Sequence, residues 1–166
     1  MLFETKTSGQ DVEQLRSENY NSSVVLAERC HEELMIMRVR PDRGIPPFLP
    51  GQYTVLGLGY WEARVADCQR EEDISQRFQK LIKRAYSISC PLLDDDGQLI
   101  GIDDMEFLEF YITLVRSAQH PPALTPRVFA LEPGDRIFCG PHIVGHYTLE
   151  GVARDANVIF AATGTG

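Results

Sequence analysis

The chain has 166 residues, of which 43% are hydrophobic, and a formal net charge of −8 at pH 7. This is the size of one ordinary domain, whose core needs neither disulfides nor a metal for stability. The acidic balance excludes general nucleic-acid binding, which needs a basic surface, and no apolar run approaches the roughly 20 residues of a membrane span.

The first residues carry no export signal. Residues 1–23 lack the basic-then-apolar order of a signal peptide, so we expect a cytoplasmic protein. Residues 1–22 are polar with little apolar periodicity, which predicts a frayed or loosely docked extension. The cysteines are widely spaced and form no Cys-x-x-Cys pair, so they are expected to be reduced and mostly buried, and no metal site is predicted from Cys30, Cys68, Cys90 and Cys139.

Three strands are predicted in the first third of the domain. Val24–Cys30 and Leu34–Val39 are apolar runs separated by three polar residues, a pattern typical of a β-hairpin. Residues 41–50 are rich in proline and predict a rigid loop. Gly51 can supply a positive φ before a third strand, Thr54–Leu58.

Residues 60–83 are strongly charged and differ from the flanking strands. Four apolar residues fall at helical spacing, which predicts a helical insertion beginning near Asp73 or Ser75; they are Ile74, Phe78, Leu81 and Ile82. We interpret the basic face formed by Arg77, Lys80 and Lys83 as solvated, with an acidic partner as the alternative.

The next stretch, Arg84–Ser89, reads as a strand that continues to Cys90. It offers a permanent cation at Arg84, a ring at Tyr86 and a hydroxyl at Ser87, groups that suit a large, flat, phosphorylated cofactor. Alternation places Ala85 and Ser87 on the opposite face from Arg84 and Tyr86 unless the strand ends or twists there. For an isolated match, the default interpretation is an exposed strand with one surface arginine.

The second half of the domain predicts two more strands and a short helix. Residues 106–116 alternate as a long strand whose apolar face is Leu108, Phe110, Ile112 and Leu114. In Leu124–Arg127, Thr125 is placed as an N-cap and Pro126 as the first helical residue. That helix start suits a pyrophosphate, or it covers a barrel end. Residues 132–135 predict a turn before a strand at Arg136–Cys139.

Two other patterns have ordinary explanations. Residues 94–97 lack the alternating ligands of a calcium loop and predict an acidic turn. His142 and His146 stand four apart, but the glycines and proline around them argue against a helix, so we interpret them as loop or strand residues, with a metal site as the remote alternative.

The chain ends in an apolar run, Asn157–Ala162, followed by Thr163-Gly164-Thr165-Gly166. A buried parallel strand that runs into a glycine-rich turn is typical of the entry to a nucleotide-phosphate site. We therefore expect residues 153–166 to be the start of a second, α/β nucleotide-binding domain that is cut short.

Six segments in this order resemble the ferredoxin–NADP(+) reductase family, bacterial type, from Val24 to the end of the chain. Each is weak alone, but the ordered set is specific. They are Pro50-Gly51-Gln52-Tyr53, Arg84-Ala85-Tyr86-Ser87, Leu108-Glu109-Phe110-Tyr111, Leu124-Thr125-Pro126-Arg127, Pro133-Gly134-Asp135 and Ala162-Thr163-Gly164-Thr165-Gly166. Residues 60–83 are longer than the connection typical of the family.

The resemblance implies an all-β fold with a small helix, a six-stranded antiparallel Greek-key β-barrel that binds FAD over residues 23–152. It implies that Arg84 holds the FAD pyrophosphate, that Tyr86 and Ser87 are the catalytic residues beside the flavin, and that Ala85 belongs to the same site. The other implied cofactor-binding residues are Tyr111, Ile112, Thr113, Leu114, Ala123, Leu124, Thr125, Thr163, Gly164 and Gly166.

The activity implied is electron transfer between NADP(H), as co-substrate, and ferredoxin or flavodoxin through FAD. The related alternatives are a flavin or oxygenase reductase with the same barrel, and a non-catalytic FAD-binding module. An electron partner would need a local basic patch, for which Arg38, Arg40 and Arg43 together with the helical insertion are candidates. The sequence does not predict the oligomeric state.

Overall fold

The computed structural model describes residues 9–72, 74–89, 96–98, 100–117 and 123–162. Its strands are β1 (Ser22–His31), β2 (Leu34–Pro41), β3 (Tyr53–Gly59), β4 (Leu81–Ser87), β5 (Leu108–Thr113) and β6 (Arg136–Cys139). Its helices are α1 (Gly9–Asn19), α2 (Ile74–Arg77) and α3 (Thr125–Val128), with a 3₁₀ turn η1 at Ile102–Asp104.

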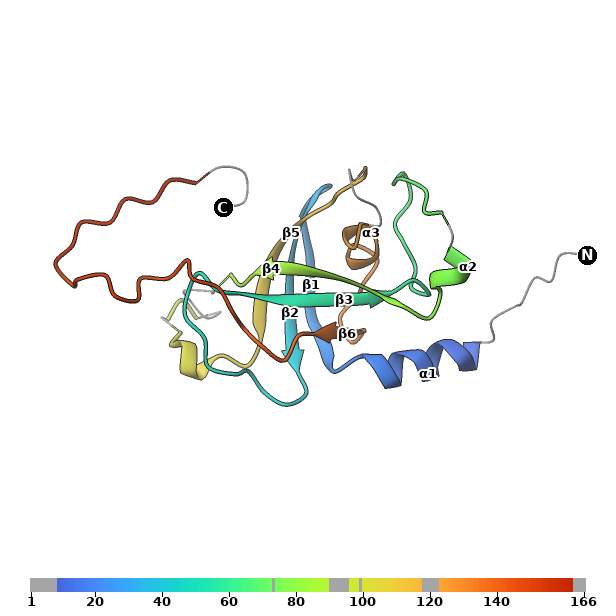
Figure 1. The fold of residues 1–166 in the computed structure, drawn as a ribbon, viewed down its shortest axis with the longest axis horizontal. Coiled ribbons are helices and arrows are strands. Elements are labelled where there is room, and N and C mark those ends of the chain that lie inside the picture. Colours follow the sequence, from blue (N-terminus) through green and yellow to red (C-terminus); the bar gives the residue numbers. More distant parts are fainter. Residues whose placement is uncertain (1–8, 73, 90–95, 99, 118–122, 163–166) are drawn as a thin grey trace, which may run out of the picture.

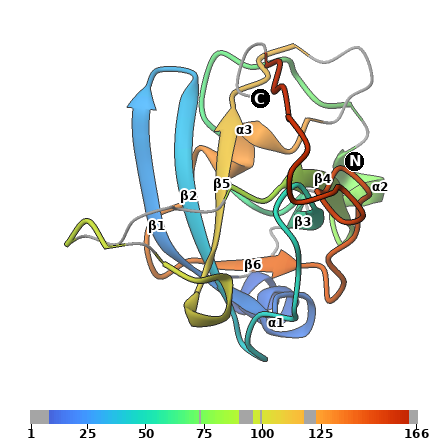
Figure 2. The same cartoon turned by 90° about the vertical axis from the view of Figure 1, so that its left-hand side faces the viewer.

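The six strands form one antiparallel sheet in the order β4-β3-β6-β1-β2-β5, which closes on itself. The closure comes from an isolated bridge, in which the Ser89 N–H donates to the Glu109 carbonyl at 2.8 Å. In Figure 2, β1, β2 and β5 stand side by side and β6 crosses them near one end. The predicted six-stranded antiparallel Greek-key barrel is confirmed, because strands distant in sequence are neighbours around the ring.

The β1–β2 hairpin forms where two apolar runs flank a polar turn, as predicted. Val24 pairs with Val39 across the two strands, and the turn lies at residues 32–33. Alternate residues of β2 face the barrel interior, where Met35, Met37 and Val39 are buried.

The β5 strand has the two faces that the alternation predicts. Leu108, Phe110 and Ile112 are buried in the core, while Tyr111 is exposed. Glu109 is a buried charge on the opposite face, where its carboxylate accepts a hydrogen bond from Arg38 Nε of β2 at 2.7 Å. The register places these two residues directly opposite each other, so the ion pair fixes the alignment of β2 and β5.

The N-terminal segment is more ordered than its polar sequence predicts. Residues 9–19 form α1, which the Glu62 carboxylate holds to the end of β3. This carboxylate accepts hydrogen bonds from Arg16 Nη2 at 2.7 Å, the Tyr20 hydroxyl at 2.8 Å and Trp61 Nε1 at 2.8 Å. The docking is polar, so apolar periodicity could not reveal it.

The predicted helical insertion is mostly not helical. Among the described residues of the β3–β4 connection (residues 60–80), only the four of α2 form a helix, and β4 begins at Leu81. Leu81 and Ile82 fit a helical spacing, but they pair with Gly59 and Leu58 of β3, and Ile82 is buried in the barrel. Tertiary pairing therefore overrides the local pattern.

The expected buried strand at residues 157–162 is also absent. Ile159 is 92% exposed and Phe160 is 71% exposed, and this stretch carries no strand assignment. In Figure 1 the segment after β6 runs away from the barrel. A parallel strand needs a neighbouring parallel strand to bond its backbone N–H and C=O groups. The described sheet contains only antiparallel pairs and offers no such neighbour.

Among the helices of the described residues, none has the length and apolar character that crossing a membrane requires.

Candidate cofactor site

The candidate site is centred on β4, whose residues 84–87 pair along one edge with β3. Arg84 lies opposite Leu56, and Ser87 lies opposite Tyr53. Along the other edge, residues 81–87 have no strand partner within the described chain, and the contact with β5 comes only at Ser89. That edge presents backbone donors and acceptors to whatever lies beside it.

Arg84 is exposed although its strand neighbours on the same face are not. Alternation puts it between Ile82, which is 3% exposed, and the half-buried Tyr86. Lys83 and Ala85 are exposed as well, so both faces of β4 open to solvent at this point. The Arg84 guanidinium donates from Nη1 to the neighbouring Lys83 carbonyl at 2.8 Å.

Tyr86 lies at the boundary between core and surface. Its ring packs edge-on against the ring of Phe110 in β5, with centroids 6.5 Å apart and an interplanar angle of 77°. Burial raises the pKa of the Tyr86 phenol to about 12, opposed by the nearby Arg84 cation. The phenol is therefore neutral at physiological pH, with an aromatic ring fixed by the barrel wall.

Ser87 ends β4 and is exposed. The next residue leaves the ladder, and the Ile88 N–H donates to the Gln52 carbonyl at 3.0 Å. The end of the strand at this point removes the strict alternation that would otherwise keep Ser87 on the far side from Arg84 and Tyr86.

The predicted contacts in β5 divide by face. Tyr111, which is 46% exposed, and Thr113 present side chains to solvent. Ile112 and Leu114 are buried in the core, so any contact that they make with a ligand would be through the backbone.

The predicted contacts before α3 lie against the end of β5. Ala123 is half-buried, while Leu124 and Thr125 are buried. The prediction that Thr125 is the N-cap is wrong: the cap is Leu124, and Thr125 is the first helical residue. Its hydroxyl is used elsewhere, because Thr125 Oγ1 accepts the Val115 N–H at 2.8 Å.

A cavity of about 410 Å³ lies between the loop before β3 and the segment after β6. It is lined by Pro50-Gly51, residues 147–149 and residues 158–160. Gly51 has a φ of +93°, and a side chain there would meet the Tyr147 carbonyl oxygen at 1.7 Å. Gly51 stands two residues before Tyr53, the strand partner of Ser87, but no residue of β4 lines the cavity.

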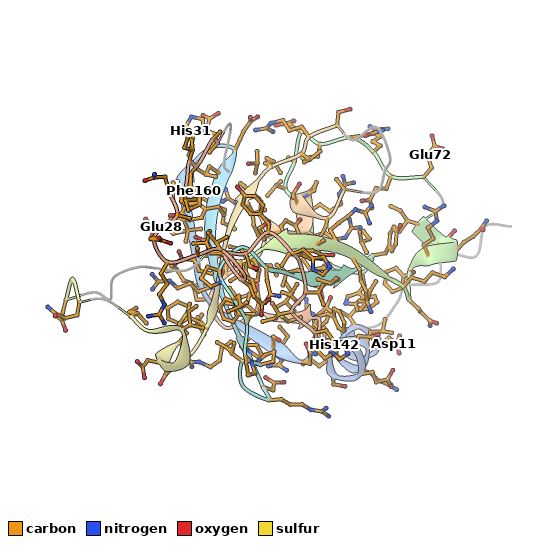
Figure 3. All side chains as sticks on the ribbon, turned by 60° about the vertical axis from the view of Figure 1, so that its left-hand side comes forward. Asp11, Glu28, His31, Glu72, His142 and Phe160 are labelled. Atoms are coloured by element: carbon orange, nitrogen blue, oxygen red, sulfur yellow. The ribbon has the colours of Figure 1, made fainter. Side chains whose placement is uncertain are left out.

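The remaining predicted residues fall elsewhere. Thr163, Gly164, Gly166 and Asp94–Asp95 lie outside the described residues. His142 is exposed on the loop after β6, and Figure 3 places it far from His31 at the β1–β2 turn. Cys139 is buried, whereas Cys30 is exposed. The prediction of mostly buried cysteines did not say which of them would be exposed.

Sequence reasoning missed the most buried charged residue near this site. Arg127, at the end of the Leu124–Arg127 segment, is 1% exposed and pairs with Glu71 of the β3–β4 connection. In the sequence, Arg127 is marked only by its position directly after the predicted cap and proline. That position does not indicate that its partner is Glu71.

The groups around β4 fit a flavin dinucleotide in their chemistry. An exposed guanidinium can bind a diphosphate, a fixed aromatic ring can pack against an isoalloxazine, and a terminal hydroxyl can hydrogen-bond a ring nitrogen; these are Arg84, Tyr86 and Ser87. The open edge of β4 adds backbone groups beside them.

No family model and no curated protein matches the sequence. The CS-b5R domains of human Ncb5or, in their NAD+ form, are similar in structure, with a TM-score of 0.55 at 13% identity, over 80% of this chain and 32% of that one. A ferredoxin NADP+ reductase from Neisseria gonorrhoeae with bound FAD and NADP gives a TM-score of 0.46 at 16% identity, over 76% and 38% of the two chains.

The chain therefore spans about a third of the length of these structures. At such identities, the similarity concerns the fold. At that level the resemblance seen in the sequence is confirmed: the chain has the barrel fold of ferredoxin reductase-like FAD-binding domains.

Proposed function

We propose that this chain is the FAD-binding part of a flavin-dependent oxidoreductase that moves electrons between NADP(H) and ferredoxin or flavodoxin. The observation that carries the proposal is the exposed Arg84 beside the half-buried Tyr86, on a strand whose second edge has no strand partner among the described residues. A cation buried in the barrel at that position would have argued for a purely structural role.

Each group has a distinct task in this proposal. Arg84 binds the diphosphate by charge-assisted hydrogen bonds, and Tyr86 supplies a neutral ring for the flavin to pack on. Ser87 hydrogen-bonds the flavin beside its reacting edge and thereby tunes it. No Gly-x-Ser-x-Gly elbow surrounds Ser87, so it is not a hydrolase nucleophile.

The bound flavin would supply the chemistry of accepting a hydride and releasing electrons one at a time. The chain's own contribution is to orient the ring and exclude water from one face. In the same proposal residues 23–152 form the FAD domain, and Thr163, Gly164 and Gly166 belong to the start of the NADP(H) domain at residues 153–166.

The predicted basic patch for an electron partner has little unpaired charge. Arg38 pairs with Glu109 and Arg40 with Glu106, at 2.7 and 3.5 Å, whereas Arg43 is an exposed loop residue. Lys83 and Arg84 of β4 are exposed cations as well, so this strand offers a further basic surface for an acidic partner.

The proposal is tested by FAD titration of the purified chain and of the variant Arg84→Ala. Loss of a charge-assisted phosphate contact should weaken FAD binding about tenfold or more. Arg43→Ala removes the same charge from an exposed loop and should leave the affinity unchanged. Equal FAD affinity in Arg84→Ala and the unaltered chain would refute the assignment.

A second measurement separates the enzyme from a binding module. FAD binding together with NADPH-dependent dye reduction supports the reductase, whereas FAD binding without reduction supports the non-catalytic module. Protein that binds no FAD contradicts both.

A further inference from the structure

A deeply buried ion pair joins α3 to the β3–β4 connection. Arg127 Nη1 and Nη2 donate to the two carboxylate oxygens of Glu71 at 2.6 and 2.7 Å. The side chains are 1% and 4% exposed. A bidentate pair of this kind fixes direction as well as distance.

The same guanidinium also holds the end of β3. Its Nε donates to the Gly59 carbonyl at 3.0 Å and its Nη2 to the Tyr60 carbonyl at 3.3 Å. It also lies 5.3 Å from the centroid of the Tyr60 ring. Arg127 therefore ties three segments together: α3, the last residues of β3 and the connection that carries Glu71.

Backbone hydrogen bonds continue this attachment on both sides of α3. The Val65 N–H donates to the Pro126 carbonyl at 2.9 Å, and the Gln69 N–H donates to the Arg116 carbonyl at 2.6 Å. Figure 1 shows the connection passing beside α3. The β3–β4 connection thus grips both α3 and the segment that follows β5.

This grip matters because α3 cannot hold its own position. It has four residues, far fewer than an independently stable helix needs, and no side chain caps it. Its first residue, Thr125, binds the Val115 N–H, so a shift of α3 would also move the end of β5.

We propose that Glu71 and Arg127 are positioning residues for the FAD site. They hold Leu124–Thr125 and the end of β5 in the arrangement that the dinucleotide needs, and the long β3–β4 connection exists to supply Glu71. This inference rests on the proposed function, because it assumes that FAD lies against these segments.

The test compares Glu71→Gln with Glu72→Gln. Glu72 is the adjacent carboxylate, but it is exposed and points away from the fold in Figure 3. Glu71→Gln removes the charge that Arg127 faces and should weaken FAD binding about tenfold, because the buried Arg127 cation loses its counter-charge. Glu72→Gln should bind FAD as the unaltered chain does.

Amide hydrogen exchange supplies a readout that does not depend on FAD. Val65 and Val115 donate to Pro126 and Thr125, so both amides should exchange faster in Glu71→Gln and at the unaltered rate in Glu72→Gln. Should Glu71→Gln fail to fold, Glu71→Asp keeps the charge but shortens its reach and should show the same two effects.

Three outcomes are distinguishable. Faster exchange at Val65 and Val115 together with weaker FAD binding supports the inference. FAD affinity that is unchanged in the folded Glu71 variant, while Arg84→Ala loses it, overturns the inference and leaves the proposed function standing. An unaltered chain that binds no FAD overturns the proposed function and this inference with it.

Discussion

At the scale of single residues, the site combines groups whose environments differ sharply over a few positions. Arg84 is exposed, Tyr86 is packed against Phe110 and Ser87 ends the strand. The sequence could predict the residue types and their order on one strand. It could not predict which of them are accessible, because that depends on the neighbours that β4 gains or lacks in the closed sheet.

The raised pKa of Tyr86 predicts a pH-dependent stability. Burial raises this pKa to about 12 in the folded chain, against an ordinary value near 10. Between these values the unfolded chain loses the phenolic proton first, so the free energy of unfolding should fall as the pH rises from about 10 to about 12. Tyr86→Phe should lack this contribution.

Urea unfolding of both proteins at pH 8, 10 and 11 checks this expectation. As the pH rises, the free energy of unfolding of the unaltered chain should fall relative to that of Tyr86→Phe. A difference that is constant over this range would contradict the buried phenol.

The glycine at position 51 is required by both its backbone and its surroundings. Its φ is +93°, and an added Cβ would lie 1.7 Å from the Tyr147 carbonyl oxygen. We expect Gly51→Ala to lower the free energy of unfolding by roughly 2 kcal/mol, from backbone strain and displacement of the segment around Tyr147.

Gly44→Ala is the matched control in urea unfolding. Gly44 also has a positive φ, +78°, but nothing lies within 4 Å of the added Cβ. It should therefore report the backbone strain alone. Equal effects of the two substitutions would show that the contact with residue 147 is not needed.

At the scale of elements, strands with regular alternation were predictable and polar docking was not. The β1–β2 hairpin and β6 follow from apolar runs with turn residues between them. In contrast, α1 is held by Glu62, more than 40 residues from Arg16 and Tyr20 in the sequence. The grip on α3 by Glu71 is of the same kind, so neither could be read from a local pattern.

The docking of α1 predicts a specific effect of Glu62→Gln. This carboxylate accepts hydrogen bonds from Arg16, Tyr20 and Trp61, and its replacement by a neutral amide should cost about 2 kcal/mol of unfolding free energy. Trp61 is the only tryptophan, so its emission should change with the same substitution.

The control is Glu13→Gln. Glu13 also pairs with Arg16, but at 3.7 Å and with an exposed side chain, so its removal should leave both stability and Trp61 emission near the unaltered values. If Glu62→Gln behaved like Glu13→Gln, α1 would not depend on the Glu62 cluster.

At the scale of the whole molecule, the fold class was predictable because six motifs in order specify one topology. The segment at residues 157–162 shows the opposite case. Its apolar run is typical of a buried strand, but burial needs a neighbouring element, and a pattern within one segment cannot provide it. The sequence therefore predicted the barrel better than the segment that follows it.

The open side of β4 has a consequence for solubility. An unpaired strand edge can recruit the same edge of another molecule, and lysine or arginine on the edge opposes such self-association. Lys83 and Arg84 are the exposed cations of this strand. We expect Lys83→Ala/Arg84→Ala to aggregate faster than Lys80→Ala/Arg43→Ala, as measured by light scattering. Equal aggregation rates of the two variants would show that the molecules do not associate along this edge. Faster aggregation of Lys83→Ala/Arg84→Ala would mean that these two cations keep the protein dispersed until a ligand covers them.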